Sequence, residues 1–510
     1  MTAGLAWIAQ RKRLAIAIAG LIPLVARILL LLVLPIPKPA IQDEFSYLLA
    51  ADTFASGRLT NPTPAFPEHF ETMQVILHPT YASKYPPFSA LVMAAGQKLT
   101  GEPWFGVWFS MGVLCAVLCW ALQGWLRPAW AFAGSLIAAV QIGIVSYWTE
   151  SYWGGTCAAI GGALVIGAVP RLIYKPRTQT AVALATGLAI LANTRPYEGF
   201  LLALVCLTWL AWAARKSLIR IALPVALALL PVFAWMSYYN YRVTGSPREM
   251  PYIAHEHQYG VPSPLLLNTS VPPAPAYSNE FLRHFWQVEF RGEWQAEQNQ
   301  FWKAHLSDLL QLARFFLGWP LALGLIFCVR ALWRDPTARQ ALVFAGCFYL
   351  GAAFDARLFP HYAAPATALA YILAASALRA MPRHFAWALA GVSVLITGFS
   401  LLTTDNRYLF GRIDYHVQAK HAAVARELTR EPGQQLVLVQ YGPHHDPWEE
   451  LVYNQADLDR SKIVWARSLS PSEDEALISH FRGRTVWLLT ENGSLHLTRS
   501  YSTSLTRSIR

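Results

Sequence analysis

Charged side chains are scarce in this sequence. Only 14% of its 510 residues are Asp, Glu, Lys or Arg, whereas 55% are hydrophobic, and the mean hydropathy is +0.31. Soluble globular domains carry about 25% charged residues, so this composition excludes a soluble enzyme. The sequence instead predicts a polytopic membrane protein.

Cysteine is scarce as well, and none of it is placed for a disulfide or a zinc site. Buried free cysteines are ordinary small core residues, and all six here lie inside apolar segments. They are Cys115, Cys119, Cys157, Cys206, Cys328 and Cys347. No small-residue cleavage site follows the first apolar run, so we expect a retained membrane helix there rather than a signal peptide.

Long apolar runs dominate the first four fifths of the chain. A helix that crosses a bilayer needs about 17–25 apolar residues, and about eleven runs approach that length. They cover residues 14–35, 104–126, 129–147, 155–172, 179–194, 197–214, 218–239, 309–332, 340–356, 361–379 and 384–403. Residues 43–56 form an amphipathic segment, which we expect to be an interfacial helix, and the shorter apolar segment 86–99 is expected to be a second interfacial or a re-entrant helix.

Basic residues between these runs set the expected orientation. Taken in alternation, six basic segments fall on one side, which the positive-inside rule makes cytoplasmic. They contain Arg11–Arg13, Arg127, Arg171 to Arg177, Arg215 to Arg220, Arg330 to Arg339, and Arg379 with Arg383. The sequence thus predicts an inner (plasma) membrane protein with a cytoplasmic N-terminus. These segments explain much of the net charge of +11, and no nucleic-acid motif is present.

The composition changes after about residue 403. Short strand-like runs at 435–441, 462–466 and 484–489 alternate with helical segments, including 471–482. This alternation predicts a small extracytoplasmic α/β domain over residues 404–510. The expected architecture is therefore a helical membrane module, residues 1–403, with outer loops 36–103 and 240–308, followed by that domain.

Two adjacent acids, Asp43 and Glu44, begin the first interfacial segment on the outer side. The dipole of a helix N-terminus keeps a carboxylate ionised, and an ionised carboxylate can take a proton from an incoming hydroxyl or amine. A plain N-terminal cap is the alternative explanation. Glu150, which ends a span among aromatic residues, is a further acidic candidate.

Cationic candidates recur at the same outer side. Lys84 precedes the Pro86-Pro87 pair and is suited to a lipid phosphate, although a lysine that snorkels to the surface gives the same pattern. Outer turns also carry Arg195 with Glu198, Asp355 with Arg357, and His361. Arg27 differs because it lies inside the first span, where a charge is costly and marks a functional candidate.

The order of Asp43-Glu44, then Lys84 with Pro86-Pro87, on about eleven spans resembles the GT-C superfamily of integral membrane glycosyltransferases. The similar groups are the dolichyl-phosphate-mannose protein mannosyltransferases and the bacterial aminoarabinose transferases. This resemblance implies a polyprenyl-phosphate sugar donor, an outer-face reaction and inversion at the anomeric carbon. It makes Asp43 the catalytic acid residue, with Glu44 beside it, and Lys84 the donor-phosphate ligand.

Other roles follow from topology within that resemblance: Glu150 as a catalytic residue, and Arg195, Arg357 and His361 as phosphate ligands. One departure is Tyr85, which separates Lys84 from the prolines.

The residues can supply direct displacement at the sugar, which needs one base and positive charge near the leaving phosphate. No Asp-x-Asp occurs in the first outer loop, so we expect metal-independent transfer without a cofactor. The expected partners are the polyprenyl-phosphate-linked sugar donor, membrane lipids, and an acceptor that is a protein, a lipid or a polysaccharide. No nucleic acid is expected.

Two other classes of function remain open at this point. A transporter or lipid-linked sugar flippase would also be polytopic and basic, but transporters usually show paired internal repeats and charges at the midplane. No repeat is visible here, and apart from Arg27 the charges gather at one face. A non-catalytic assembly protein, whose tail binds envelope partners, is the third alternative.

Overall fold

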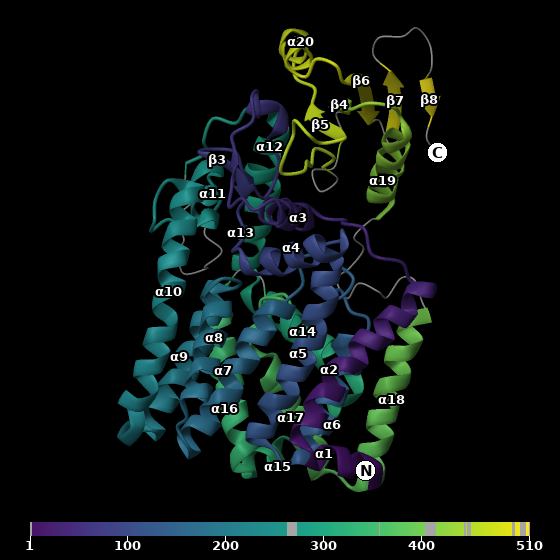
Figure 1. Ribbon diagram of the computed structural model, residues 1–510. Coiled ribbons are helices and arrows are strands. Elements are labelled where there is room, and N and C mark those ends of the chain that lie inside the picture. Colours follow the sequence, from purple (N-terminus) through teal and green to yellow (C-terminus); the bar gives the residue numbers. More distant parts are fainter. Residues whose placement is uncertain are drawn as a thin grey trace.

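A bundle of long helices carries two layers of smaller elements on one of its ends, and the chain begins at the opposite end (Figure 1). This computed structural model describes residues 3–262, 273–355, 358–402, 415–442, 445, 450–491, 495–499 and 506–508. The elements of the bundle are α1 (Ala3–Gln10), α2 (Lys12–Leu29), η1 (Leu30–Leu32), α5 (Trp104–Trp125), α6 (Pro128–Ala138), η3 (Ala139–Gly143), α7 (Thr156–Tyr174), α8 (Thr178–Ala192), α9 (Pro196–Ala213), η4 (Arg215–Ser217), α10 (Leu218–Thr244), α14 (Phe301–Phe327), α15 (Val329–Arg334), α16 (Pro336–Ala352), η6 (Ala364–Ala366), α17 (Thr367–Ala380) and α18 (Arg383–Leu402).

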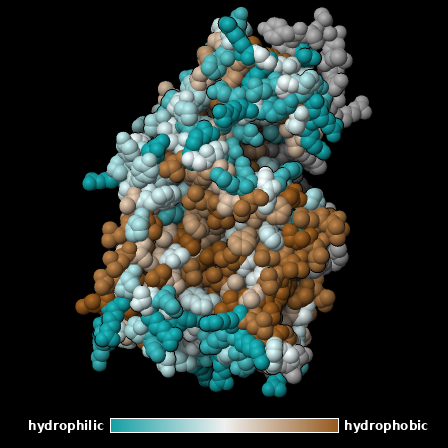
Figure 2. Space-filling view, viewed as in Figure 1, coloured by the Kyte–Doolittle hydropathy of each residue, from teal (hydrophilic) through white to brown (hydrophobic). Residues whose placement is uncertain are grey.

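On the face shown in Figure 2, the surface of the bundle is an apolar belt between two polar ends. Within the described ranges, six helical stretches are long and apolar enough to cross a membrane, and four more are apolar but shorter. This pattern agrees with a multi-pass membrane protein, while the eleven spans predicted from the sequence stay a prediction. Several predicted spans are shorter or interrupted as helices. The span predicted at 309–332, for example, is kinked at Gly318, whose φ is 66°.

Helix α7 runs through the core of the bundle and approaches the η6 turn closely. A Cβ atom added at Gly162 would lie 1.8 Å from the carbonyl oxygen of Pro365, so only glycine permits this approach. The contact matters for the site because η6 directly follows His361 and Tyr362 in the chain.

The first outer loop forms a layer across the end of the bundle (Figure 1). Its elements are α3 (Gln42–Ala55), β1 (Asn61–Pro62), η2 (Pro67–Phe70), β2 (Val75–Ile76), β3 (Thr80–Ser83) and α4 (Phe88–Thr100). The two helices predicted on this loop are confirmed as α3 and α4, which share one apolar cluster. The strands form a small antiparallel sheet in the order β1-β3-β2.

A second outer segment follows α10 and contributes four short helices. They are α11 (Pro251–Tyr259), α12 (Glu280–His284), η5 (Phe285–Phe290) and α13 (Arg291–Asn299). Tyr259 of α11 packs with Met73 of the first loop and with Trp286. This cluster joins the two outer loops.

The tail forms a five-stranded sheet in the order β5-β4-β6-β7-β8. Its elements are α19 (Tyr415–Arg430), β4 (Gln435–Tyr441), β5 (Ile463–Arg467), α20 (Pro471–His480), β6 (Thr485–Glu491), β7 (Leu495–Arg499) and β8 (Thr506–Ser508). Strands β5, β4 and β6 are parallel, and β7 and β8 run antiparallel to their neighbours. The three strands predicted from the sequence are therefore confirmed as β4, β5 and β6.

The sheet packs against the first outer loop of the membrane module. One of its faces shares an apolar cluster with the first outer loop, in which Leu436 and Leu438 of β4 join Leu49 of α3 and Phe70. The other face packs against α19. Figure 1 shows the sheet above α3 and α4, on the side away from the bundle. Its status as a separate domain from residue 404 stays a prediction.

Candidate active site

The candidate site is assembled where α3, the end of β3 and two turns of the bundle meet. The backbone N–H of Phe88 donates to the carbonyl of Asn193 at 3.0 Å, which fastens the start of α4 to the turn between α8 and α9. The carboxylate of Glu44 accepts the N–H of Tyr152 at 2.9 Å, which fastens α3 to the turn before α7. These bonds bring residues from distant parts of the chain to one place.

Asp43 lies half-buried in the first turn of α3, and its Oδ1 accepts a hydrogen bond from the hydroxyl of Tyr85. The ring of Tyr85 stacks on Tyr47, one helical turn after Asp43, with centroids 4.4 Å apart and planes 9° from parallel. Burial strongly raises the pKa of Tyr85, so its hydroxyl stays protonated and acts as the donor. This hydrogen bond holds the carboxylate of Asp43 in a fixed direction.

Lys84 follows β3 directly, and its ammonium lies 5.3 Å from the centroid of the Tyr85 ring. Burial lowers the pKa of Lys84, while the nearby charges of Asp43 and Glu256 act in the opposite direction. Glu256 comes from α11, and no motif in the sequence pointed to it. Lys84 is thus a half-buried lysine near two acidic side chains, rather than a lysine extended freely to the surface.

Arg195 supplies the second positive charge, in the turn between α8 and α9. Its guanidinium carbon lies 4.2 Å from the centroid of the Tyr362 ring. Although burial opposes the charge, the neighbouring Tyr47, Tyr362 and Glu198 raise the pKa of Arg195. The guanidinium also lowers the pKa of Lys84, so the two cations act on one region.

His361 is buried beside this cluster but brings no positive charge to it. Its Nδ1 lies 3.0 Å from the hydroxyl of Tyr147, and its ring centroid lies 4.5 Å from that of Trp153. Burial lowers the pKa of His361 well below its ordinary value, and the charge of Arg195 lowers it further. A neutral imidazole can orient a hydroxyl but adds no charge opposite a phosphate. Arg357, the remaining predicted phosphate ligand, lies outside the described residues.

Glu44 is the second candidate base, and its oxygens are already occupied. Oε2 accepts the backbone N–H groups of Ala40 at 2.6 Å and Ile41 at 3.2 Å, and Oε1 accepts that of Tyr152. Burial raises the pKa of Glu44 to about 7, although these three hydrogen bonds act against the rise. The geometry is that of a helix-capping acid, because Glu44 takes part in a capping box at the start of α3.

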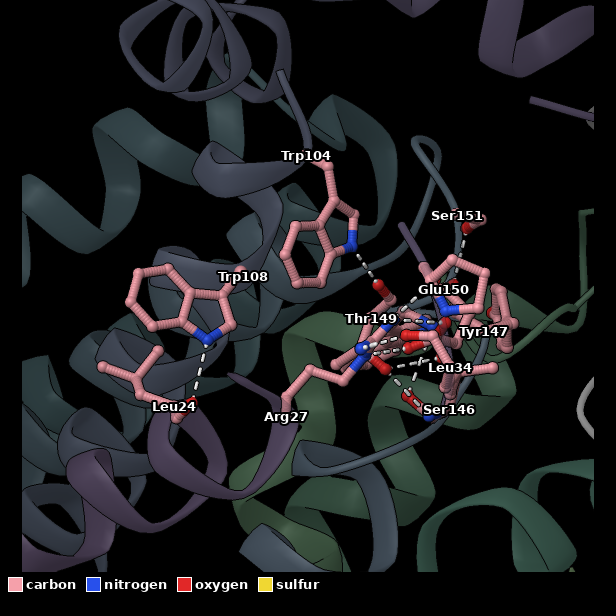
Figure 3. A network of polar contacts seen from close by, with 12 residues as sticks. Leu24, Arg27, Leu34, Trp104, Trp108, Ser146, Tyr147, Thr149, Glu150 and Ser151 are labelled. Carbon is pink, nitrogen blue, oxygen red and sulfur yellow. Dashed lines mark hydrogen bonds and ion pairs between the residues drawn. The ribbon is translucent and has the colours of Figure 1, made fainter. Parts of the chain in front are cut away.

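Glu150 forms a buried ion pair with Arg27, the arginine inside the first span (Figure 3). Nε and Nη2 of Arg27 donate to the two carboxylate oxygens at 2.6 and 3.0 Å. The guanidinium also donates to the carbonyls of Leu34 and Pro35, at 3.0 and 3.2 Å. Because both oxygens bind one guanidinium, this geometry disfavours Glu150 as a catalytic residue and indicates a structural role.

Replacing Glu150 by alanine is expected to lower the free energy of unfolding by about 3–5 kcal/mol, because it leaves the guanidinium of Arg27 buried without a counter-charge. Thermal unfolding of the purified protein in detergent measures this loss. The double variant Arg27→Met/Glu150→Leu is the matched control and should recover most of it, since neither charge remains. A Glu150→Ala variant as stable as the parent would show that the pair contributes nothing.

The residues that the structure describes include no group of three or more His, Cys, Asp or Glu side chains arranged to hold a metal ion. Metal-independent transfer stays a prediction.

Comparison with known proteins gives no match at the level of sequence families. The sequence matches no protein-family model and has no significant similarity to a curated protein. The structure, in contrast, is similar to solved structures along nearly its whole length.

Two structures of ArnT from Cupriavidus metallidurans are similar to this chain. The structure bound to undecaprenyl phosphate is 14% identical, with a TM-score of 0.51, over 94% of this chain and 93% of that chain. The apo structure is 16% identical, with a TM-score of 0.53, over 96% and 94%.

An oligosaccharyltransferase from Archaeoglobus fulgidus, in complex with Zn and sulfate, is similar as well. It is 13% identical, with a TM-score of 0.50, over 94% of this chain and 68% of that chain. The chain therefore shares its fold with these two proteins, in agreement with the GT-C resemblance that the order of its sequence motifs predicted.

Proposed function

We propose that this protein transfers a sugar from a polyprenyl-phosphate donor to a hydroxyl or amine of an acceptor. The observation that carries the proposal is the cluster of one oriented carboxylate, Asp43, with two cations, Lys84 and Arg195. The GT-C fold supports it, and the ArnT structure bound to undecaprenyl phosphate supports a lipid phosphate as the donor.

In the proposed reaction, Asp43 takes the proton from the acceptor as the acceptor atom attacks the anomeric carbon. The bond between that carbon and the phosphate oxygen breaks on the opposite side, so the configuration inverts. Lys84 and Arg195 stabilise the negative charge that develops on the leaving phosphate. Tyr85 holds the carboxylate in position, and the protein forms no covalent intermediate.

The remaining predicted residues take supporting roles in this proposal. Glu44 is the competing base, and Glu150 anchors Arg27. His361 orients Tyr147 near the cations, and Arg357 is proposed as an additional phosphate ligand from its position in the sequence.

We further propose that the reaction takes place at the outer face of the inner (plasma) membrane, with the N-terminus in the cytoplasm. The support comes from the basic segments between the spans, which the positive-inside rule assigns to the cytoplasm. The candidate site belongs to the opposite end of the bundle, with the outer loops and the C-terminal sheet.

The purified protein, reconstituted in liposomes with a radiolabelled undecaprenyl-phosphate sugar and a cell-envelope extract as acceptor, tests this function. We expect the label to leave the lipid fraction while free undecaprenyl phosphate appears in equal amount. Label that crosses the bilayer while still attached to the lipid would contradict the proposal and support a flippase. Label that stays on the lipid and does not cross the bilayer would contradict sugar transfer from this donor.

A further inference from the structure

One side of α3 faces the C-terminal sheet instead of the bundle. Phe45, Leu49 and Asp52 follow each other at intervals of four and three residues, so they lie on one face of the helix. Leu49 is 3% exposed and belongs to the apolar cluster of the sheet. The helix that carries Asp43 is therefore held between two parts of the protein.

A short segment before β5 contacts both ends of this helix face. The ring of Tyr453 stacks on Phe45 with centroids 4.2 Å apart and planes 3° from parallel. The backbone N–H of Ala456 donates to Oδ2 of Asp52 at 2.8 Å. Tyr453 is 9% exposed, so this contact is buried rather than a surface encounter.

The segment is itself fixed to the sheet. The side-chain amide of Asn454 donates to the carbonyl of Trp465 at 2.7 Å, and its oxygen accepts the N–H of Trp465 at 2.9 Å. Glu450 pairs with Arg467 of β5, and its Oε1 accepts the N–H of Val452 at 2.9 Å. These bonds give Tyr453 a rigid support, because both ends of its segment are tied to β5.

The sheet is also tied to the strands of the first outer loop. Nδ1 of His69 lies 2.7 Å from the carbonyl oxygen of Arg467, and the hydroxyl of Tyr81 donates to the carbonyl of Asn454 at 3.3 Å. These hydrogen bonds fasten the layer that carries Lys84 and Tyr85 to the sheet.

We propose that Tyr453 is a positioning residue for Asp43, and that the C-terminal sheet is an obligatory part of the active site although no predicted site residue lies in it. This proposal rests on the proposed function, because it assigns Asp43 as the base. Phe45 is two residues after Asp43 on the same helical turn, so the stacked ring limits rotation of that turn. On the bundle side the turn is held by Glu44 and Tyr85, and Tyr453 closes the opposite side.

Replacing Tyr453 by alanine is expected to lower the turnover rate of transfer by about ten- to a hundred-fold, because small displacements of a catalytic group cost that much. The KM for the donor should change little, since Lys84 and Arg195 stay in place. Tyr453→Phe keeps the stacked ring and should turn over at nearly the parent rate. A Tyr453→Phe variant as slow as Tyr453→Ala would overturn the proposal, because stacking would then not be the cause.

Hydrogen–deuterium exchange gives a readout that does not depend on transfer. Tyr453→Ala should increase exchange across α3, whereas Leu497→Ala, which removes a buried side chain from the far face of the sheet, should leave α3 protected. Unchanged exchange in α3 of Tyr453→Ala would overturn the positioning role. Because exchange needs no substrate, this result is distinguishable from a failure of the labelled-donor assay, which would overturn the proposed function instead.

Discussion

Asp43→Asn is expected to lower the turnover rate of sugar transfer by about 10²- to 10⁴-fold, while donor affinity changes little. Asparagine has nearly the size of aspartate, and Asp43 lies inside the first turn of α3 rather than at its N-cap, which is Ile41, so α3 should remain folded. It can still accept the hydrogen bond from Tyr85, but it cannot take a proton from the acceptor. Single-turnover measurements with labelled donor separate the chemical step from binding.

Glu44→Gln is the matched comparison for this variant. Because Glu44 accepts three backbone N–H groups, its replacement should mainly reduce stability, which a thermal unfolding measurement records beside the rate. Full activity in Asp43→Asn together with loss in Glu44→Gln at unchanged stability would assign the base to Glu44. Full activity in both variants would exclude the proposed mechanism.

Lys84→Ala is expected to raise the KM for the donor by about ten- to a hundred-fold. A charged hydrogen bond to a phosphate contributes about 1.5–3 kcal/mol, and its loss corresponds to that change. Folding should suffer less, because the aliphatic part of one half-buried side chain contributes little to packing. Donor titrations at constant acceptor, together with thermal unfolding, distinguish the two effects.

Lys98 provides the control for Lys84. It lies exposed near the end of α4, on the same outer loop, so Lys98→Ala removes a charge of the same kind close to the membrane surface. It should leave the KM for the donor unchanged. If Lys84→Ala transfers sugar as well as the parent and Lys98→Ala do, Lys84 is a surface lysine without a role in donor binding.

The sequence predicted local features well where a short repeat of apolar residues determines them. Helices α3 and α4 and strands β4, β5 and β6 occur within one or two residues of the expected bounds. Span number was harder to predict, because an apolar run can contain a break such as that at Gly318, which hydropathy does not register.

Contacts between distant segments could not be predicted in the same way. The partner of Arg27 is Glu150, 123 residues away, and the two were separate candidates in the sequence. Tyr85, which binds Asp43, was visible only as an insertion between Lys84 and the prolines. Glu256, on α11, belongs to a loop that carried no recognisable motif.

What the sequence determined by itself is the class of the protein and the placement of Asp43 and Lys84 on one loop, because composition and periodicity act locally along the chain. The tertiary structure decided which partner each of the three acids binds. Asp43 accepts a hydrogen bond from a phenol, Glu44 accepts hydrogen bonds from backbone N–H groups, and Glu150 pairs with a guanidinium. These partners come from separate segments, so only the packing of helices, loops and sheet could assign them.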